Sequence, residues 1–158
     1  MNKNILLLLY LIFSLSATAC ELHNAPQLKP IIPDTTVISL GGNTFIDTKF
    51  ELADAINNNG ITTWSSEKSA FNVYFNNEKA RTCALYISLL PGEFSSKIKL
   101  TLGKQSHVVQ LTKFQKNPVL IGNFALTAGY QKLVLEGISR ETKSFAAISS
   151  LTIVTNDP

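Results

Sequence analysis

Apolar and polar residues alternate with a period of two along most of the chain after Thr36. The alternation is clearest in the segments 71–75, 82–89 and 97–102, where every second residue is apolar. Successive side chains of a strand point to opposite faces, and one apolar face is typical of antiparallel strands that pack on one side only. The pattern therefore predicts an antiparallel β domain in which each strand buries one row of side chains.

Further strands are predicted at less regular apolar runs, namely 37–40, 44–47, 107–112, 119–126, 130–136 and 145–154. Turn signals separate these runs at Gly41-Gly42, Pro91-Gly92, Gly103-Lys104, Asn117-Pro118 and Ala128-Gly129. Short strands at this spacing indicate a sandwich or a barrel. We therefore expect a single all-β domain over 36–155, followed by a short tail at 156–158.

One segment has a different period. Between 50 and 56 the apolar residues recur at helical spacing, and the run ends in Asn57-Asn58-Asn59-Gly60, which is typical of a helix stop. The sequence therefore predicts one short helix near 50–57 on an otherwise β domain.

The first 19 residues have the composition of a cleavable signal peptide. Lys3 supplies a positive charge, an apolar run covers 5–13, and the segment ends in the small residues Ala17-Thr18-Ala19. The apolar run is too short for a spanning helix, which takes about 20 apolar residues. We therefore expect residues 1–19 to be removed and the rest of the chain to fold outside the cytoplasm.

Cys20 follows this cleavage point and leaves two alternatives open. Residues 15–20 resemble the lipobox of bacterial lipoproteins, whose cysteine carries a lipid anchor, although Ala17 stands where a larger apolar residue is usual. In the other interpretation cleavage is ordinary, and Cys20 pairs with Cys83 in a disulfide. The proline-containing stretch 20–35 suits an extended tether. We therefore expect a membrane-anchored lipoprotein of the bacterial cell envelope in preference to a soluble periplasmic or secreted protein.

Charge and motifs exclude several classes of function. The formal net charge is +3, and Lys3 is the only charged residue among the first 19, so the remaining chain is nearly neutral. Proteins that bind nucleic acid carry a basic patch or stripe, and this sequence has none. It also contains no nucleophile elbow, phosphate loop, Cys-x-x-Cys or His-Glu-x-x-His motif. We therefore expect no nucleic-acid partner and no enzymatic activity.

Histidines and carboxylates are the remaining candidates for chemistry. His23 lies in the tether, and His107 is expected to be a solvent-facing strand residue. Asp47, Glu51 and Asp54 fall within eight positions, and carboxylate oxygens are ligands that Ca²⁺ prefers. Their spacing matches no calcium-binding loop, so a solvated helix face is the favoured interpretation. We assign no metal site and no cofactor, and we keep a structural calcium as the alternative.

A series of short blocks between 37 and about 155 resembles a known family. The blocks are ISLGGNTF at 38–45, TWS at 63–65, FNVYF at 71–75, GNFAL at 122–126, GYQK at 129–132, LEGISR at 135–140 and FAAI at 145–148. In this order they are similar to the uncharacterised family called domain of unknown function 5077. The resemblance implies an antiparallel jelly-roll β-sandwich of the galactose-binding-like type. It also implies a carbohydrate-binding-like function, by analogy of fold.

A sugar-binding function would use aromatic rings and polar side chains. A flat ring stacks on the apolar face of a pyranose, and the sugar hydroxyls need hydrogen-bond partners. The candidate ligand-binding residues are Trp64, Tyr74, Tyr130, Asn43 and Arg140. The alternative for Trp64 and Tyr130 is that they close the ends of the core, since large aromatic residues are mostly buried.

The sequence therefore predicts a non-catalytic exported binding module with a glycan as its partner. The alternative is an envelope lipoprotein with a structural or protein-interaction role, an envelope protein as partner and no small ligand. In both cases the only membrane contact expected is the lipid on Cys20.

Overall fold

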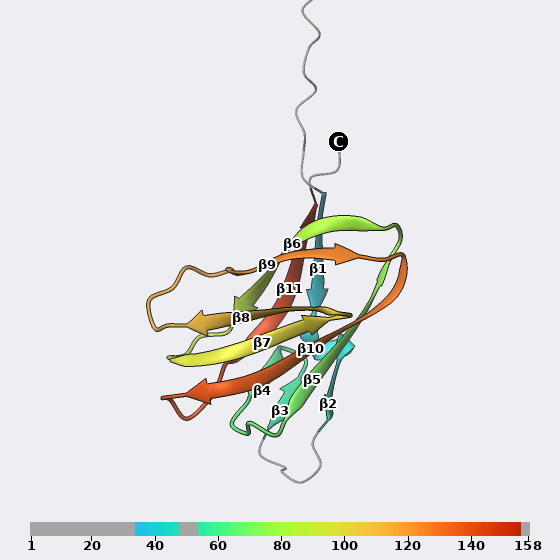
Figure 1. Cartoon of the computed structure of the whole chain (residues 1–158). Helices are drawn as coiled ribbons and strands as arrows, with labels where there is room; N and C mark the ends of the chain where they lie inside the picture. Colours follow the sequence, from blue (N-terminus) through green and yellow to red (C-terminus); the bar gives the residue numbers. More distant parts are fainter. Residues whose placement is uncertain (1–33, 48–53, 156–158) are drawn as a thin grey trace, which may run out of the picture. The chain divides into compact units, whose positions relative to one another are not determined.

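The computed structural model describes residues 34–47 and 54–155, which form two antiparallel sheets in separate layers (Figure 1). Sheet A has the order β3-β4-β11-β6-β9, and β1 also pairs with β11. Its strands are β1 (Asp34–Ser39), β3 (Ala55–Asn57), β4 (Gly60–Thr63), β6 (Arg81–Leu89), β9 (Val119–Leu126) and β11 (Ile148–Thr155). Sheet B has the order β2-β5-β10-β7-β8. Its strands are β2 (Thr44–Asp47), β5 (Ala70–Asn77), β7 (Ser96–Leu102), β8 (Gln105–Leu111) and β10 (Gly129–Arg140).

The chain passes repeatedly from one sheet to the other, so strands that are distant in sequence become neighbours. β1 pairs with β11 along its whole length, from Asp34 opposite Thr155 to Ser39 opposite Ser150. In sheet B, β10 lies between β5 and β7 and pairs with both. Within the described residues, no helix is long and apolar enough to cross a membrane.

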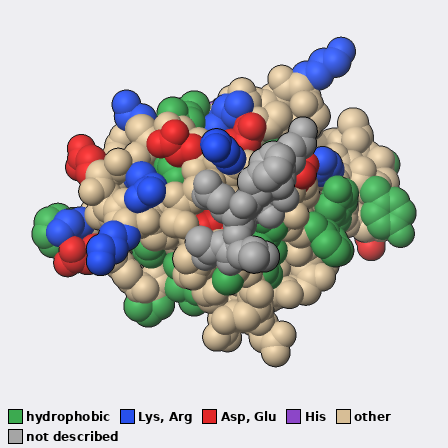
Figure 2. All heavy atoms as spheres, turned by 90° about the horizontal axis from the view of Figure 1, so that it is seen from below, with side chains coloured by type: hydrophobic (Ala, Val, Ile, Leu, Met, Phe, Trp, Pro, Cys, Tyr) green, Lys and Arg blue, Asp and Glu red, His purple; other side chains and the backbone are tan. Residues whose placement is uncertain are grey.

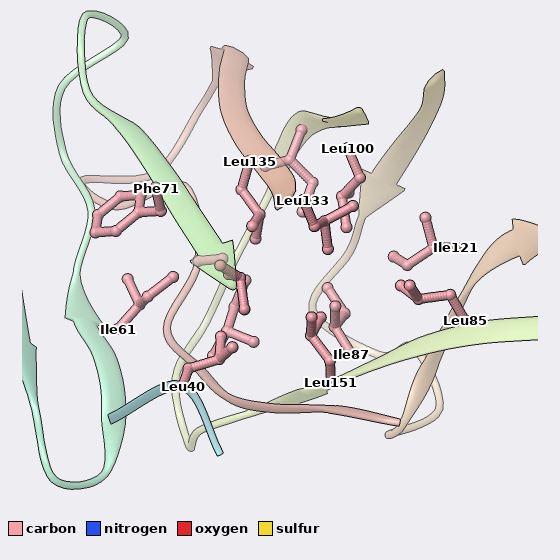
Figure 3. Packing of buried hydrophobic residues seen from close by; sticks show 14 of the residues in the cluster. Leu40, Ile61, Phe71, Leu85, Ile87, Leu100, Ile121, Leu133, Leu135 and Leu151 are labelled. Carbon is pink, nitrogen blue, oxygen red and sulfur yellow. The ribbon is translucent and has the colours of Figure 1, made fainter. Parts of the chain in front are cut away.

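The apolar side chains of the alternating segments pack together in the core of the sandwich. Apolar side chains of both sheets meet in one interior, where Phe71, Leu100 and Leu133 of sheet B face Leu85 and Leu151 of sheet A (Figure 3). These five side chains are almost completely buried. Each large apolar side chain buried in this way contributes about 1.5–3 kcal/mol from the hydrophobic effect. The predicted strands at 71–75, 82–89 and 97–102 are therefore confirmed, with the predicted row of each facing inward.

The short helix lies elsewhere than predicted. It is the single turn α2 (Leu40–Asn43), at the Gly41-Gly42 pair expected to be a plain turn. Leu40 enters the core, and Gly41 lies so close to the β3–β4 hairpin that a Cβ atom would come within 2.5 Å of the Asn58 carbonyl oxygen. The helix predicted near 50–57 is wrong in its described part, because Ala55–Asn57 form β3; residues 50–53 lie outside the described residues.

The hairpin between β3 and β4 explains this difference. Asn57 pairs with Gly60 across a turn formed by Asn58 and Asn59, and the Asn59 N–H donates to Asn57 Oδ1 at 2.8 Å. Gly60 has a φ of 113°, which favours glycine. Asparagine and glycine are common in tight hairpin turns as well as at helix ends, so the same residues fitted both interpretations.

His107 also differs from expectation. Its ring is half-buried and packs edge-on against Phe124, with ring centroids 4.7 Å apart, while Nε2 lies 3.1 Å from the Asn123 carbonyl oxygen. Beside it, the Gln105 side chain forms two 2.9 Å hydrogen bonds with the backbone of Ala125. The prediction of a solvent-facing histidine is wrong, because His107 helps to link β8 to β9 along one side of the sandwich.

Candidate functional site

The outer face of sheet B carries three exposed aromatic side chains on three adjacent strands. Phe45 of β2 is 63 % exposed, Tyr74 of β5 is 41 % exposed and Tyr130 at the start of β10 is 91 % exposed. We call these three residues the aromatic diagonal. Exposed apolar groups that gather on one surface mark an interaction site more often than scattered single residues do.

The strand register sets the geometry of the aromatic diagonal. Phe45 pairs with Asn72, so Tyr74 lies two residues further along β5. Tyr74 in turn pairs with Lys132, and Tyr130 lies two residues before Lys132 in the antiparallel strand β10, opposite Asn76. Diagonal neighbours of this kind are about 7–8 Å apart at their Cα atoms, within the reach of aromatic side chains. The rings of Phe45 and Tyr74 meet edge to face with centroids 5.8 Å apart.

Polar side chains accompany the aromatic diagonal. Lys132 lies opposite Tyr74 and Asn76 lies opposite Tyr130, and both are exposed. Asn72, beside Phe45, is buried and presents little of its amide to solvent. The surface thus offers flat rings together with one ammonium group and one amide.

Charged side chains of both signs occur on the described part of the domain. Figure 2 shows lysine, arginine, aspartate and glutamate side chains interspersed on the side that it presents. Among the described residues, ion pairs link Arg81 to Asp34, Lys99 to Glu136 and Lys113 to Glu93. Of these, Lys99 and Glu136 lie on the outer face of sheet B, with N and O atoms 2.8 Å apart. This mixed surface suits a neutral ligand better than a polyanion.

Trp64 does not belong to this surface. Its side chain is 0 % exposed, and its ring packs against Phe71 and Phe145 with centroids 5.0 Å and 5.4 Å away. The Trp64 carbonyl oxygen accepts hydrogen bonds from the Phe145 N–H and the Ser144 hydroxyl, so it also holds the loop before β11. The prediction that Trp64 contacts a ligand is contradicted by its burial, and the alternative role as a core residue is confirmed.

Arg140 and Asn43 are both exposed but engaged in local contacts. Arg140, at the far end of β10 from Tyr130, donates from one guanidinium nitrogen to the carbonyl oxygens of Thr142 and Lys143, at 2.8 Å and 2.9 Å. Its guanidinium also lies 5.5 Å from the centre of the Phe145 ring. Arg140 therefore lies apart from the aromatic diagonal. Asn43 lies two residues before Phe45, and its amide donates to the Ser39 carbonyl oxygen.

Phe45 was not among the candidate ligand-binding residues predicted from the sequence. β2 has only four residues, and Phe45 is flanked by Thr44 and Ile46, both of which suit a strand interior. The alternation within 44–47 therefore does not show which side chains face inward. Tyr74 and Tyr130 were found because a long polar row and a glycine turn, respectively, indicated exposure.

Asp54 is a buried carboxylate whose hydrogen bonds are supplied by the protein. It accepts from the backbone N–H and the hydroxyl of Ser65, the latter at 2.8 Å, and from the Ser66 N–H at 3.2 Å. Burial alone would raise the pKa of Asp54, but the donors of Ser65 and Ser66, together with the nearby Ser69 hydroxyl, lower it below 3.8. The Ser69 hydroxyl itself forms no hydrogen bond of normal geometry.

The hydrogen bonds of Asp54 are relevant to the alternative prediction of a structural calcium site at Asp47, Glu51 and Asp54. Asp54 directs its oxygens to serine donors, Asp47 is exposed on β2, and Glu51 lies outside the described residues. Within 34–47 and 54–155, no three histidine, cysteine or acidic side chains come together as a metal site would need. Asp54 thus has a structural role, in which its carboxylate oxygens accept hydrogen bonds from serine donors.

Cys83 is a buried free thiol on the inner face of β6. Burial raises the pKa of the Cys83 thiol despite the positive charge of Arg81 nearby, which disfavours the reactive thiolate form. Cys20, its partner in the disulfide alternative and the predicted site of lipidation, lies outside the described residues.

Comparisons with known proteins agree with this architecture. A mannanase chain from Podospora anserina that carries a family 35 carbohydrate-binding module (CBM35) superposes with a TM-score of 0.54 at 12% identity, over 78% of this chain and 28% of that one. Similar structures also include a CBM35 from Cellvibrio japonicus (TM-score 0.49, 13% identity, 78% of this chain and 95% of that one). A family 35 module from Clostridium thermocellum has a TM-score of 0.45 at 12% identity, over 76% and 97% of the two chains.

The likeness to the mannanase chain concerns the fold, and together with the two antiparallel sheets it confirms the predicted jelly-roll sandwich. The chain spans little more than a quarter of the mannanase chain. No curated protein sequence matches the chain. The family described as domain of unknown function DUF5077 matches residues 38–158, which is most of the sequence. The chain therefore belongs to the DUF5077 family.

Proposed function

We propose that this chain is a non-catalytic binding module that holds a neutral glycan on the aromatic diagonal. The observation that carries the proposal is the placement of Phe45, Tyr74 and Tyr130 on adjacent strands with their rings exposed. An exposed ring gains most when it covers the apolar face of a ligand that has both an apolar and a polar side. Pyranose rings have this form, and the likeness to CBM35 folds supports the same ligand class.

The polar companions would complete the recognition. A sugar that stacks on Tyr74 and Tyr130 would place its hydroxyls near the Asn76 amide and the Lys132 ammonium, since both lie in the same two cross-strand rows. Amide and ammonium donors are suitable partners for hydroxyl oxygens. A row of rings along a diagonal suits a chain of sugar residues better than a single one.

The interactions of two carboxylates, Glu136 and Asp54, support a binding role without catalysis. The Glu136 carboxylate pairs with Lys99 at 2.8 Å, and Asp54 is bonded to serine donors. Glycoside hydrolysis normally needs two carboxyl groups that flank the scissile bond, one of which is protonated. A carboxylate whose pKa is lowered, as that of Asp54 is, favours the ionised form and is poorly suited to act as the proton donor.

Removal of the aromatic rings is the direct test. Purified domain is screened on a glycan array, and the polysaccharide it binds is then used for affinity electrophoresis and calorimetry. We expect Phe45→Ala and Tyr74→Ala each to weaken binding about tenfold, and the double variant to weaken it further, because stacking on each ring is lost.

The control is Leu120→Ala, because Leu120 is an exposed apolar side chain on β9 of sheet A, away from the aromatic diagonal. Its binding should equal that of the wild type. Equal binding by the wild type and the Phe45/Tyr74 double variant, or loss of binding in Leu120→Ala alone, would refute the proposed surface.

A protein-interaction role is the second candidate, and the outer face of sheet A favours it. Val37, Thr152, Tyr86 and Leu120 form one cross-strand row over four strands, with exposed aliphatic side chains at both ends. This surface faces away from the aromatic diagonal. A domain that binds no glycan on the array, and whose partner in envelope extracts is retained by the Phe45/Tyr74 double variant, would support this role instead.

We also propose that the domain acts outside the cytoplasm, held to a membrane by a lipid on Cys20. The support is the signal-like composition of 1–19 and the proline-containing stretch that follows. We expect the mature protein to begin at Cys20 with the added mass of a diacylglycerol and acyl groups. An intact mass that begins at Cys20 without lipid would contradict the anchor.

A further inference from the structure

A second candidate site lies at the other end of sheet B. The β6–β7 loop (90–95) and the β8–β9 loop (112–118) border a pocket of about 240 Å³ that is open to solvent, which we call the cavity. Ser96, which begins β7, is in register with Leu111, which ends β8, and with Arg140, which ends β10. From Lys132 to Arg140 the strand β10 extends roughly 25 Å at the usual rise per residue. The cavity and the aromatic diagonal are therefore separate.

Contacts between the two loops hold the cavity open without a ligand. The Asn117 side chain forms two hydrogen bonds with the backbone of Leu89, one to its N–H and one to its carbonyl oxygen, both 2.9 Å long. Lys113 Nζ and Glu93 Oε2 lie 2.6 Å apart and join the two loops a second time. A cavity formed in advance loses little conformational entropy on binding.

Gln115 supplies the observation that points to a ligand. Its Oε1 accepts from the Thr112 N–H at 3.1 Å, which fixes the orientation of the amide. Its Nε2 is buried and has no hydrogen-bond partner, although Gln115 is one of the residues that line the cavity. Buried donors are nearly always paired, and one left unpaired beside a cavity indicates a group that a bound molecule would satisfy.

The other lining residues define the class of that molecule. Apolar surface comes from Leu89, Leu90, Pro91 and Phe94, and polar groups come from Thr112, Gln115 and Asn117. The charges of Lys113 and Glu93 neutralise each other. A compact neutral molecule with an apolar face and hydroxyl groups on its edge fits this lining, and a charged one does not.

We propose that the cavity binds a single neutral pyranose residue, with Gln115 Nε2 donating a hydrogen bond to one of its hydroxyl groups. The proposal shares its ligand class with the proposed function but not its surface. A chain held along the aromatic diagonal and a lone or terminal sugar in the cavity are independent binding events.

Titration of the ¹⁵N-labelled domain with glucose, galactose, mannose and xylose tests the cavity directly, with glucuronate as the charged comparison. We expect at least one neutral sugar to shift the Gln115 side-chain amide and the Phe94 resonances in a saturable way, and glucuronate to leave them unchanged.

Gln115→Glu keeps the acceptor for the Thr112 N–H but removes the donor. It should bind the same sugar about tenfold more weakly, the loss expected for one hydrogen bond. Gln115→Leu should show the same loss with no added charge.

The control variant Gln110→Glu carries the same change on the exposed side of β8, outside the cavity, and should bind like the wild type. The proposal is overturned if no neutral sugar shifts Gln115 and Phe94, or if both Gln115 variants bind as tightly as the wild type. It is also overturned if monosaccharide binding is lost in the Phe45/Tyr74 double variant, because the sugar would then occupy the aromatic diagonal and the proposed function would stand.

Discussion

Replacing Trp64 with alanine is expected to lower the free energy of unfolding by about 3–5 kcal/mol, the usual cost of removing a buried tryptophan or phenylalanine ring. The Trp64 side chain is fully buried, and its ring contacts those of Phe71 in β5 and Phe145 in the loop before β11. Its loss would leave a cavity between the two sheets. Denaturant unfolding followed by circular dichroism measures the change.

Trp64→Phe is the matched control. It keeps an aromatic ring in the core, and it removes the indole Nε1, which is buried without a hydrogen-bond partner. We therefore expect this variant to cost less than about 1.5 kcal/mol, as conservative core changes usually do. Wild-type stability in Trp64→Ala together with loss of glycan binding would contradict the core role and restore Trp64 as a ligand residue.

Replacing Asp54 with asparagine is expected to cost about 1.5–3 kcal/mol at pH 7, because hydrogen bonds to a charged acceptor become hydrogen bonds to a neutral one. The donors are the Ser65 and Ser66 backbone N–H groups and the Ser65 hydroxyl. Asp47→Asn, which changes an exposed carboxylate on β2, should stay within about 0.5 kcal/mol of the wild type.

The pH dependence follows from the direction of the pKa shift. The folded state lowers the pKa of Asp54 below 3.8, so Asp54 stabilises the fold at pH values above the unfolded pKa. This contribution is lost as the pH falls through the folded pKa. The difference in unfolding free energy between the wild type and Asp54→Asn should therefore be full at neutral pH and shrink below about pH 4. A difference that stays constant down to pH 2 would contradict the assignment.

The regular strands could be predicted because one face of each strand is exposed to solvent. At 71–75 and 82–89, polar residues alternate with apolar ones, and the apolar row faces the core in the structure. Trp64 could not be predicted in the same way. Its sequence neighbours are threonine and serine, which suggest a loop, and its burial comes from Phe145, which lies far away in sequence.

The candidate site depends on which strands pair with each other, and the local sequence pattern does not predict that pairing. Tyr74 and Tyr130 could be identified as exposed from local pattern, but their proximity follows from the pairing of β5 with β10. Phe45 joins them only because β2 pairs with β5 in a register that places it beside Tyr74. The cavity at Gln115 likewise needs two loops that meet through Asn117 and Leu89.

The most direct measurement is an NMR map of the bound glycan. The ¹⁵N-labelled domain is titrated with an oligosaccharide of the polysaccharide selected on the array. We expect the largest shift changes on β2, β5 and the start of β10, around Phe45, Tyr74 and Tyr130. Shift changes confined to the outer face of sheet A, or a set of shifts unaltered by the Phe45/Tyr74 double substitution, would contradict it.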